Sequence, residues 1–494
     1  MTHLDGLNAP AARQPMTGSH LEALESRTLL SGAGSPDRVG PLDTGPAVTT
    51  VYVESNNPQP GQNAVLALRR NPADGSLHQI GKFLTGGTGQ ANPNNELGPD
   101  DPDQQVISSP DKRFLFAVNQ GSNSVAVFRI RRNGSLARVG TFDSGGTQPS
   151  SLGSAGHRLY VTNRGDSHAN NPGTVAGNYT GFNVSDDGVL TPIPNSTVTL
   201  PLGLSPSQTL ISSDRRFVFG DNFAIPGTTP PLGNTIDPFQ IAANGTLQAA
   251  PDGPVGPSTT LLGLAAHPTQ RIIYGGLTAA SRIGVFSYDA NGSVTFVRAV
   301  SDQGAGPCWV AVSPDGKYLY AANTGSNSVE VYSLANPLNP QQIQDFKLAI
   351  PQPPAGATKA PVGTFELAVD PSGRSVDVII EATAQTFPQG NEVHSLAVAA
   401  DGTLSEPNAP VTFSAENVPA TARIQGIAIV GGRAGGPDHS DAGDRPDGTP
   451  AGGALAQSPN SPFSVVPLSG ATSAGAESGI DTLLNFAHAR RGSR

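Results

Sequence analysis

The densest group of side chains that could do chemistry lies in the insertion N-R-G-D-S-H, which contains Arg164, Asp166 and His168. A guanidinium holds a carboxylate or phosphate through two parallel hydrogen bonds, and an imidazole near a carboxylate can transfer a proton. The spacing predicts that Arg164 binds an anionic substrate while His168, near Asp166, acts as acid or base. The alternative is that these loop side chains are solvated and have no role.

Two glutamates, Glu366 and Glu381, fall inside segments with the pattern of buried strands, F-E-L-A-V and V-D-V-I-I-E-A. A carboxylate on a strand that lines a channel is uncommon unless it has a partner or a bound cation. Both residues are therefore candidates for binding a polar ligand or an ion.

The only cysteine and the only tryptophan, Cys308 and Trp309, are neighbours. Trp309 is either a platform on which a ligand stacks or a plug that packs the centre of the domain. Cys308 has no histidine near it in the sequence, which argues against a nucleophilic role. A single cysteine also excludes an intrachain disulfide.

Several classes of function lack their signatures. The sequence has no HExxH, C-x-x-C, EF-hand or P-loop spacing, so we expect neither a metal nor a cofactor. The net charge of −10 argues against a nucleic-acid partner, and no segment approaches the roughly 18 apolar residues of a membrane span. We expect His267, before Pro268, in a turn, and His157 and His394 at the surface.

The elements that must position these residues are internal repeats. The segment S-P-D-K-R-F-L-F-A-V-N-Q-G-S-N-S-V-A-V-F at Ser109–Phe128 returns without a gap as S-P-D-G-K-Y-L-Y-A-A-N-T-G-S-N-S-V-E-V-Y at Ser313–Tyr332. A chain that repeats in this way reuses one supersecondary unit. Function should then depend on what differs between the copies.

Each unit contains four short β-rich runs, with N-G or D-G pairs in the turn after the third run, as tight hairpins require. Seven units can be counted, the first opening on its second strand near Val51. One strand, Arg423–Gly432, is left over and would supply the innermost strand of the first unit. The sequence therefore predicts an all-β fold, a seven-bladed β-propeller over 48–432.

In such a ring the first strands line a channel, and the loops after the second strands lie at the same mouth, which is the default binding site. The predicted substrate-binding residues are Gln148, Asn163, Asn222, Trp309, Asn323, Glu366 and Glu381. Further candidates are Gln105, Asn119, Asn123, Asp166, Gln208, Asp221 and Asn327. Asn119 and Asn323 more often cap a turn than bind a ligand. Asp111 and Asp315 belong to S-P-D corners at the opposite face and are expected to be structural.

The units resemble a known family. They carry the pattern S-P-D-G-[KR]-x-[LV]-Y-x-x-N, and Cys308–Ser326 reads C-W-V-A-V-S-P-D-G-K-Y-L-Y-A-A-N-T-G-S. These features are similar to the seven-bladed lactonase family with YVTN-type repeats, which includes 6-phosphogluconolactonase-like and carboxymuconate-cyclase-like proteins. The resemblance implies a lactone-converting activity. It also marks Asp221 as a catalytic candidate beside Arg164 and His168.

The sequence departs from that family at one linker. Lactone-handling members typically read G-P-R-H and then N-E-L, whereas this chain has Gly306-Pro307-Cys308-Trp309 and Asn323-Thr324-Gly325. The matching histidine and glutamate are replaced, so two functions stay open. One is a lactonase-like or cycloisomerase-like enzyme that acts on a small carboxylated lactone. The other is a non-catalytic propeller that binds a protein or glycan at the cell surface. With either function we expect a monomer.

The two ends of the chain, 1–47 and 433–494, are rich in Gly, Pro and polar residues and are predicted to be disordered. Within the first, Leu21–Gly32 resembles the L-E-x-R-x-L-L element of exported planctomycete proteins, through Leu24, Glu25, Arg27, Leu29, Leu30 and Ser31. This predicts an extracellular or cell-surface protein, with a cytoplasmic one as the alternative. Ile480–Arg491 is either a frayed tail or a short helix.

Overall fold

The computed structural model describes residues 48–90, 104–166, 173–224, 234–251, 253, 255–257, 259–358, 360–384 and 386–431. All of them fall in one of two units of the chain, and the other unit, 1–45 with 435–442, lies outside them. Four predictions concern segments outside the described residues. These are the catalytic role of His168, the export element at Leu21–Gly32, the segment Ile480–Arg491 and the two disordered ends.

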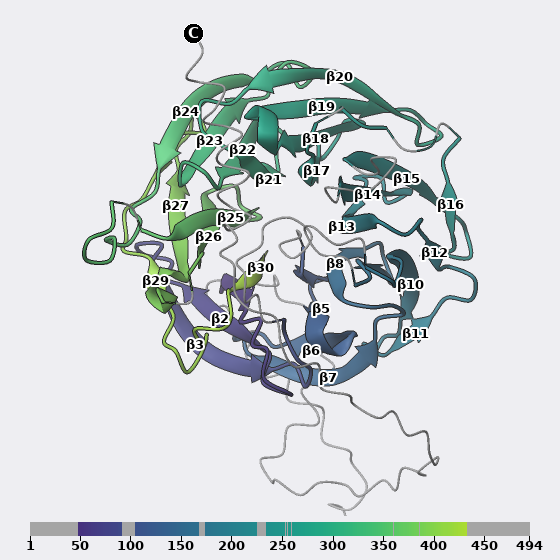
Figure 1. Cartoon of the computed structure of the whole chain (residues 1–494), viewed down its shortest axis with the longest axis horizontal. Coiled ribbons are helices and arrows are strands. Elements are labelled where there is room, and N and C mark those ends of the chain that lie inside the picture. The colour runs from purple at the N-terminus through teal and green to yellow at the C-terminus, as the bar shows by residue number, and fades with distance from the viewer. Residues whose placement is uncertain are drawn as a thin grey trace, which may run out of the picture. The chain divides into compact units, whose positions relative to one another are not determined.

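Seven antiparallel sheets, called blades, surround a central channel, as Figure 1 shows. Strands are given from the channel outward. Blade 1 contains β30 (Gln425–Val430), β1 (Thr50–Glu54), β2 (Ala64–Arg70) and β3 (Leu77–Leu84). Blade 2 contains β4 (Val106–Ser108), β5 (Phe114–Asn119), β6 (Ser124–Ile130) and β7 (Leu136–Asp143). Blade 3 contains β8 (Pro149–Ser154), β9 (Arg158–Asn163), β10 (Asn178–Val184) and β11 (Leu190–Pro192), with β12 (Val198–Thr199) also paired to β10. Blade 4 contains β13 (Leu204–Ile211), β14 (Phe217–Ala224), β15 (Thr235–Ile241) and β16 (Leu247–Ala249).

The other three blades follow the same order. Blade 5 contains β17 (Leu262–Ala266), β18 (Ile272–Leu277), β19 (Arg282–Tyr288) and β20 (Val294–Ser301). Blade 6 contains β21 (Pro307–Val312), β22 (Tyr318–Asn323), β23 (Ser328–Ser333) and β24 (Gln341–Lys347). Blade 7 contains β25 (Val362–Val369), β26 (Ser375–Ala382), β27 (Glu392–Val398) and β28 (Leu404–Ser405), with β29 (Val411–Thr412) also paired to β27. Three short 3₁₀ turns are η1 (Gln120–Ser122), η2 (Thr278–Ala280) and η3 (Pro388–Gly390).

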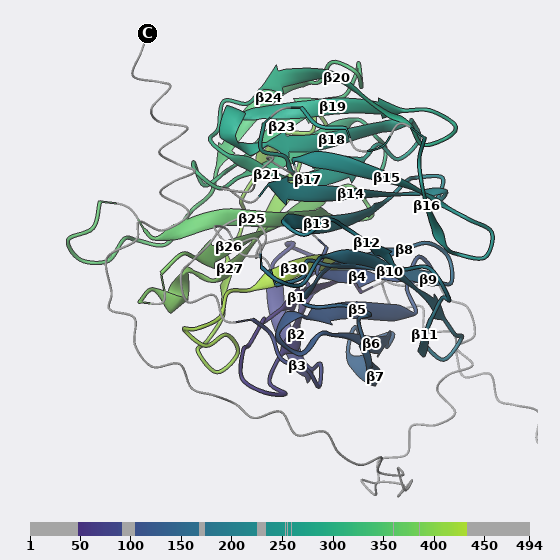
Figure 2. The same ribbon diagram turned by 45° about the vertical axis from the view of Figure 1, so that its right-hand side comes forward.

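The last strand closes the ring. β30 pairs antiparallel with β1, with Tyr52 opposite Ala428, and so becomes the innermost strand of the blade that begins the domain. Figure 2 shows β30 beside β1 in a second view. Closure leaves no inner strand edge of blade 1 unpaired. The predicted seven-bladed propeller, with the C-terminal strand completing the first blade, is confirmed.

The core lies largely between neighbouring blades. The third residue of the second strand is a fully buried aromatic in six blades, namely Tyr52, Phe116, Tyr160, Phe219, Tyr274 and Tyr320. Three of these tyrosines donate to a backbone carbonyl in the next blade, each at 2.9 Å. Blade 7 has Asp377 at this position. The blades are therefore held together by one recurrent aromatic contact, from which blade 7 departs.

The histidine predictions had different outcomes. His157 is exposed and His267 accepts turn hydrogen bonds through Nδ1, as predicted. The prediction that His394 is exposed was wrong, because it lies buried on β27 between Glu392 and Glu406. Burial alone would lower the pKa of His394, but these two carboxylates outweigh burial and raise it.

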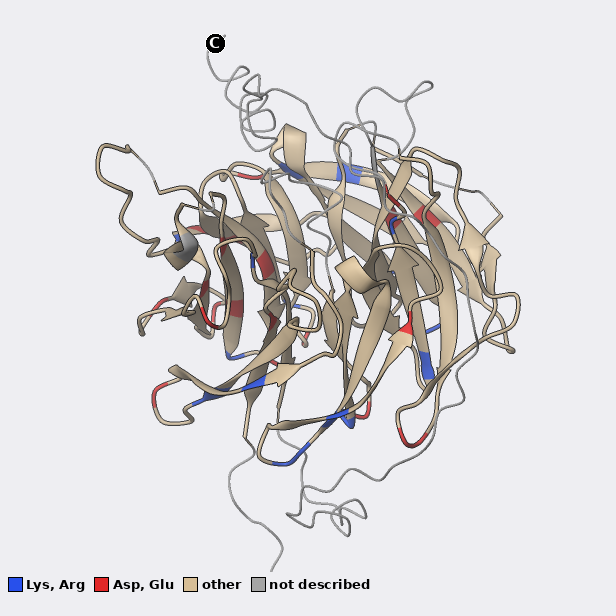
Figure 3. Cartoon of the chain, turned by 60° about the horizontal axis from the view of Figure 1, so that its bottom comes forward, with Lys and Arg blue, Asp and Glu red and all other residues tan. Residues whose placement is uncertain are grey.

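Charges of both signs are dispersed over the described strands and loops, as Figure 3 shows. The part of the chain that the structure describes therefore carries Lys and Arg together with Asp and Glu in this view. None of its helices is long and apolar enough to cross a membrane. Across the same residues, no three His, Cys, Asp or Glu side chains gather in a way that could hold a metal ion.

Candidate functional site

The end of the channel where the inner strands begin, called the upper mouth below, is built from β-bulges. The inner strands β8, β13, β17, β21 and β25 each shift register against the second strand near their first residues. The pairing of β30 with β1 shifts at the corresponding place. Bulges re-aim side chains and are common next to binding sites. The repeated bulge brings polar groups of different blades toward one another.

Asp221 links two of these bulges. Its carboxylate accepts hydrogen bonds from the Ser207 hydroxyl of blade 4 and, at 3.0 Å, from the Gly263 backbone N–H of blade 5. The side chain is 0% exposed. Burial raises the pKa of Asp221 to about 7, although both hydrogen bonds oppose the shift. The neighbouring Asn222 donates to Asp237, whose pKa burial raises to about 6.

Gln208 bonds to residues of two other blades. Its Nε2 lies 3.0 Å from Gln104 Oε1 and 2.9 Å from the Leu264 carbonyl, and its Oε1 accepts from the Leu264 N–H at 2.5 Å. Gln104 and Gln208 also line a cavity of about 480 Å³, whose other walls are mainly aliphatic side chains of the inner strands. These two glutamines therefore supply polar groups to a largely apolar part of the channel.

Arg164 is the distinctive residue of the mouth. It directly follows the second strand of blade 3, and its side chain is fully buried. The equivalent residues of blades 5 and 6 are Thr278 and Thr324, which donate to carbonyls of the next inner strand at 2.9 and 2.8 Å. Blades 5 and 6 thus have a small hydroxyl at this position that bonds within the fold. Blade 3 has a guanidinium with five N–H donors there.

The two predicted glutamates lie at the seam between blades 7 and 1. Arg423 Nη1 is 3.5 Å from Glu381 Oε2, and Glu366 Oε1 accepts from the Gly426 N–H at 3.1 Å. Both carboxylates therefore have protein partners. Arg164 and Asp221, in contrast, belong to blades 3 and 4 across the channel.

Comparison with known proteins identifies the family. The family model "Lactonase, 7-bladed beta-propeller" matches residues 61–171 and 233–378, slightly more than half of the chain. The protein belongs to the seven-bladed β-propeller lactonase family.

The curated proteins that the chain matches are distant from it in sequence. The 6-phosphogluconolactonase of Yersinia enterocolitica is 25% identical over 234 residues, covering 46% of this chain and 62% of that protein. The Yersinia pestis enzyme is 26% identical, with the same coverage. The chain thus spans about three fifths of the length of the curated relatives that it matches.

Solved structures share the propeller fold. The periplasmic gluconolactonase of Pseudomonas aeruginosa has a TM-score of 0.56 and 18% identity, covering 78% of this chain and all of that one. A protein from Lactobacillus plantarum has a TM-score of 0.55 and 16% identity, with coverages of 78% and 99%. At these identities the likeness shows the fold alone.

The linker at which the sequence departs from lactonase relatives is used for packing. Trp309 is 1% exposed and its ring centroid lies 5.0 Å from that of Phe365 in blade 7. Cys308 is the bulged residue of β21, and Thr324 bonds to the Thr364 carbonyl. Trp309 and Thr324 thus join blade 6 to blade 7.

The predicted asparagines mostly form hydrogen bonds or contacts with the linkers between blades. Asn119 accepts from Asn63 Nδ2 at 2.9 Å and from Thr85 Oγ1 at 2.5 Å, both in blade 1 or the linker after it. Asn163 donates to the Ser144 carbonyl at 3.1 Å, and Asn323 lies against Gly304. These side chains do more than cap their own turns, because they reach the preceding linker.

The remaining candidates occupy turns and loops around the mouth. Asn123 accepts from the Gln148 N–H at 2.8 Å, and both residues have positive φ. Asn327 also has positive φ and reaches the Val362 carbonyl at 3.4 Å. Asp166 accepts from the Thr174 and Val175 N–H groups and so organises its own loop. Gln105 is fully buried beside the channel.

Sequence reasoning missed several polar groups of the mouth, namely Gln104, Ser207, Gly263 and Arg423. Arg423 is the first residue of the predicted leftover strand Arg423–Gly432 but lies two residues before β30, at the linker that leads into it. Ser207 and Gly263 could have been found as the bulge positions of blades 4 and 5. Nothing in the local sequence, however, indicates that Asp221 joins them.

Proposed function

We propose that this protein hydrolyses a small lactone that carries an anionic group, at the upper mouth of the propeller. Family membership supports the reaction class. The buried Arg164 is the observation that carries the proposal, since a guanidinium suits a substrate carboxylate or phosphate. Sugar lactones such as 6-phosphogluconolactone and carboxylated muconolactones are the proposed substrates.

In this proposal Asp221 positions the site. Both carboxylate oxygens already accept hydrogen bonds, from Ser207 and from Gly263, and the side chain is fully buried. A general base must instead reach the attacking water within hydrogen-bond distance. Asp221 therefore holds the bulges of blades 4 and 5 in place, and His168 is the proposed base that would activate the water.

The test is turnover of a lactone panel by the full-length protein, followed by acid release at constant pH. The panel contains 6-phosphogluconolactone, gluconolactone and a muconolactone. We expect Arg164→Gln to reduce kcat/KM for the anionic lactones by about 100-fold, the size of effect seen when one transition-state donor is removed. The neutral gluconolactone should lose less, because it offers no anion to Arg164.

The matched control is Arg282→Ala, which removes an exposed arginine from β19. It should turn over every lactone at the parental rate. Turnover no faster than the uncatalysed reaction for the whole panel would reject the proposed reaction. Equal loss on charged and neutral lactones in Arg164→Gln would reject the anion-binding role.

A second function, a non-catalytic propeller that binds a protein or glycan, is favoured by one observation. Trp309 and Thr324, at the positions of the family's histidine and glutamate, pack blade 6 against blade 7. This function predicts that the parent and Arg164→Gln are equally inactive on every lactone. The same assay therefore separates the two functions.

A further inference from the structure

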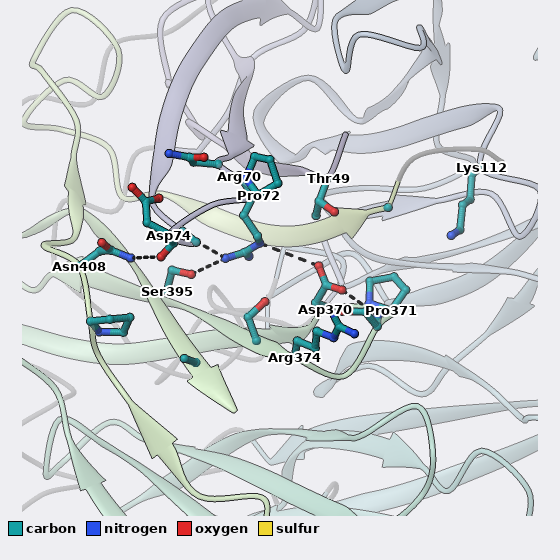
Figure 4. Close-up of a pocket in the computed structure, with 17 residues that line it drawn as sticks. Thr49, Arg70, Pro72, Asp74, Lys112, Asp370, Pro371, Arg374, Ser395 and Asn408 are labelled. Carbon is teal, nitrogen blue, oxygen red and sulfur yellow. Dashed lines mark hydrogen bonds and ion pairs between the residues drawn. The ribbon is translucent and has the colours of Figure 1, made fainter. Parts of the chain in front are cut away.

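A polar pocket opens between blades 7 and 1, at the face opposite the upper mouth. Its volume is about 460 Å³, within the range of sites that hold small molecules. Its walls come from the Asp370–Ser375 corner, the loop after β2, strand β27, the Pro407–Asn408 loop and Lys112 of blade 2. Figure 4 shows Arg70 in the middle of this seam pocket, and Lys112 apart at one side.

The seam pocket exists because blade 7 lacks the aromatic side chains that fill the equivalent space elsewhere. The first and third residues of the second strand are Phe114 and Phe116 in blade 2, and Tyr318 and Tyr320 in blade 6. Blade 7 has Ser375 and Asp377 at these positions. The third residue is aromatic in the six other blades and the first in blades 2, 4 and 6, so blade 7 alone has no aromatic side chain at either position.

A glycine in the turn after the third strand of one blade lies against the second strand of the blade before it. The space around that glycine therefore shows how well each junction is filled. A Cβ on Gly188, Gly292 or Gly402 would lie 2.5, 2.6 or 2.3 Å from an aromatic ring of the preceding blade. A Cβ on the equivalent Gly75 of blade 1 would approach only the Asn408 amide, at 3.9 Å. The departure from the repeat therefore opens a cavity as well as changing its chemistry.

The back of the seam pocket is an ion-pair network centred on Arg70. Arg70 donates to Asp377, to Ser395 Oγ at 2.5 Å and to the Gly75 carbonyl at 3.2 Å, and its Nε lies 3.9 Å from Asp370. Asp377 is fully buried. Removing one partner of a buried pair is costly, so this network fixes the wall without supplying a free charge.

The outer edge of the seam pocket, called the rim, carries the positively charged side chains of Arg374 and Lys112. Arg374 is exposed and Lys112 half-buried, and among the described residues no hydrogen bond or ion pair engages either side chain. Between rim and wall lie the hydroxyl of Ser372, the amides of Asn71 and Asn408, and three proline rings, Pro72, Pro371 and Pro407. Asn408 Nδ2 also donates to the Asp74 carbonyl at 2.9 Å, and Asn71 Oδ1 accepts from the Ala73 N–H at 3.0 Å. These groups offer an anchor for one anion, partners for several hydroxyls and apolar faces for a ring.

We propose that the seam pocket binds a sugar acid, a polyhydroxylated ring or chain with one carboxylate. Arg374 and Lys112 hold the carboxylate, Ser372 and the asparagine amides bind hydroxyls, and the prolines contact the C–H face. The sugar acid is either a free monosaccharide acid or the uronate of a glycan. The proposal is independent of lactone hydrolysis, which belongs to the opposite face.

Isothermal titration calorimetry of the full-length protein tests this with D-gluconate, D-glucuronate and a short oligogalacturonide, and with neutral D-glucose as the contrast. We expect binding of at least one acid and at least about 10-fold weaker binding of glucose, because a charge-assisted hydrogen bond is lost. Binding of the monosaccharide acids supports a free ligand, whereas binding of the oligomer alone supports a glycan. No heat with any acid, or equal binding of glucose, would overturn the proposal.

Variants distinguish binding in the seam pocket from a general effect of positive surface charge on acid binding. Arg374→Ala combined with Lys112→Ala should weaken acid binding by at least about 10-fold. Lys317→Ala removes the cation at the equivalent corner of blade 6, where it pairs with Asp315, and should bind as the parent does. Ser375→Tyr restores the residue that blade 6 has at this position and should fill the pocket and abolish binding. Parental binding by the double variant would refute the assignment, whether or not Ser375→Tyr folds.

Discussion

At the scale of single residues, Asp221 shows how one side chain can stabilise the fold while lying at the upper mouth. Asp221→Ala leaves the Gly263 N–H buried without its acceptor, and leaves the Ser207 hydroxyl only the carbonyl of residue 221, at 3.5 Å. We expect this to lower the free energy of unfolding by about 2 kcal/mol, since an unsatisfied buried polar group costs about 1–3 kcal/mol. Asp221→Asn keeps an acceptor oxygen and should cost about 1 kcal/mol. Urea denaturation measures both changes.

The same pair of variants tests whether Asp221 acts in proton transfer. If it only positions the bulges, Asp221→Asn keeps lactone turnover within about 10-fold of the parent, with an unchanged pH profile. A loss of the rise in activity near pH 7, where the pKa of Asp221 lies, would instead assign it as the base. The profile separates the roles even if both variants lose some activity.

At the scale of elements, the linker from β20 to β21 is held by two carboxyl groups that share a buried space. Glu330 accepts from the Gln303 and Gly304 N–H groups at 3.4 and 3.1 Å, and Asp302 accepts from the Tyr332 hydroxyl at 2.9 Å. Burial, with the nearby charge of Asp302, raises the pKa of Glu330 to about 8, and burial raises that of Asp302 to about 6. Glu330 and Asp302 therefore bind more protons in the folded protein than in the unfolded chain at the same pH.

This linker makes stability depend on pH. A carboxyl group whose pKa is raised by folding contributes less stability as pH rises from its unfolded value, about 4.5 for Glu330, through its folded value, about 8. We therefore expect the thermal midpoint to fall between pH 5 and pH 9. Glu330→Gln cannot ionise and should make this decline shallower. Parallel curves for the parent and the variant, measured by circular dichroism, would contradict the assignment.

How much of these elements can be predicted depends on whether the interacting residues lie close together in the sequence. The N-G and D-G turns and the S-P-D corners are local signals, so the seven blades and the closing strand could be predicted from them. Contacts such as Asp221 with Gly263, or Glu381 with Arg423, join residues of different repeats. Neither spacing nor composition identifies such pairs. For the same reason Trp309 could be predicted to pack, but not to pack against Phe365.

At the scale of the whole molecule, the ring depends on its last strand. β30 supplies the inner edge of blade 1, the Gly426 N–H that binds Glu366 follows its first residue, and Arg423, the partner of Glu381, lies just before it. A chain that ends at Ala422 loses all three contacts and exposes the edge of β1, which invites aggregation. We expect it to lose its cooperative thermal transition. The control chain, ending at Gly431, keeps β30 and should melt as the full-length protein does. Suppose the chain ending at Ala422 melted cooperatively within about 5 °C of that control, a shift worth about 4 kcal/mol at roughly 2.1 cal/mol/K per residue in a domain of this size. Closure by β30 would then not be what holds the ring together.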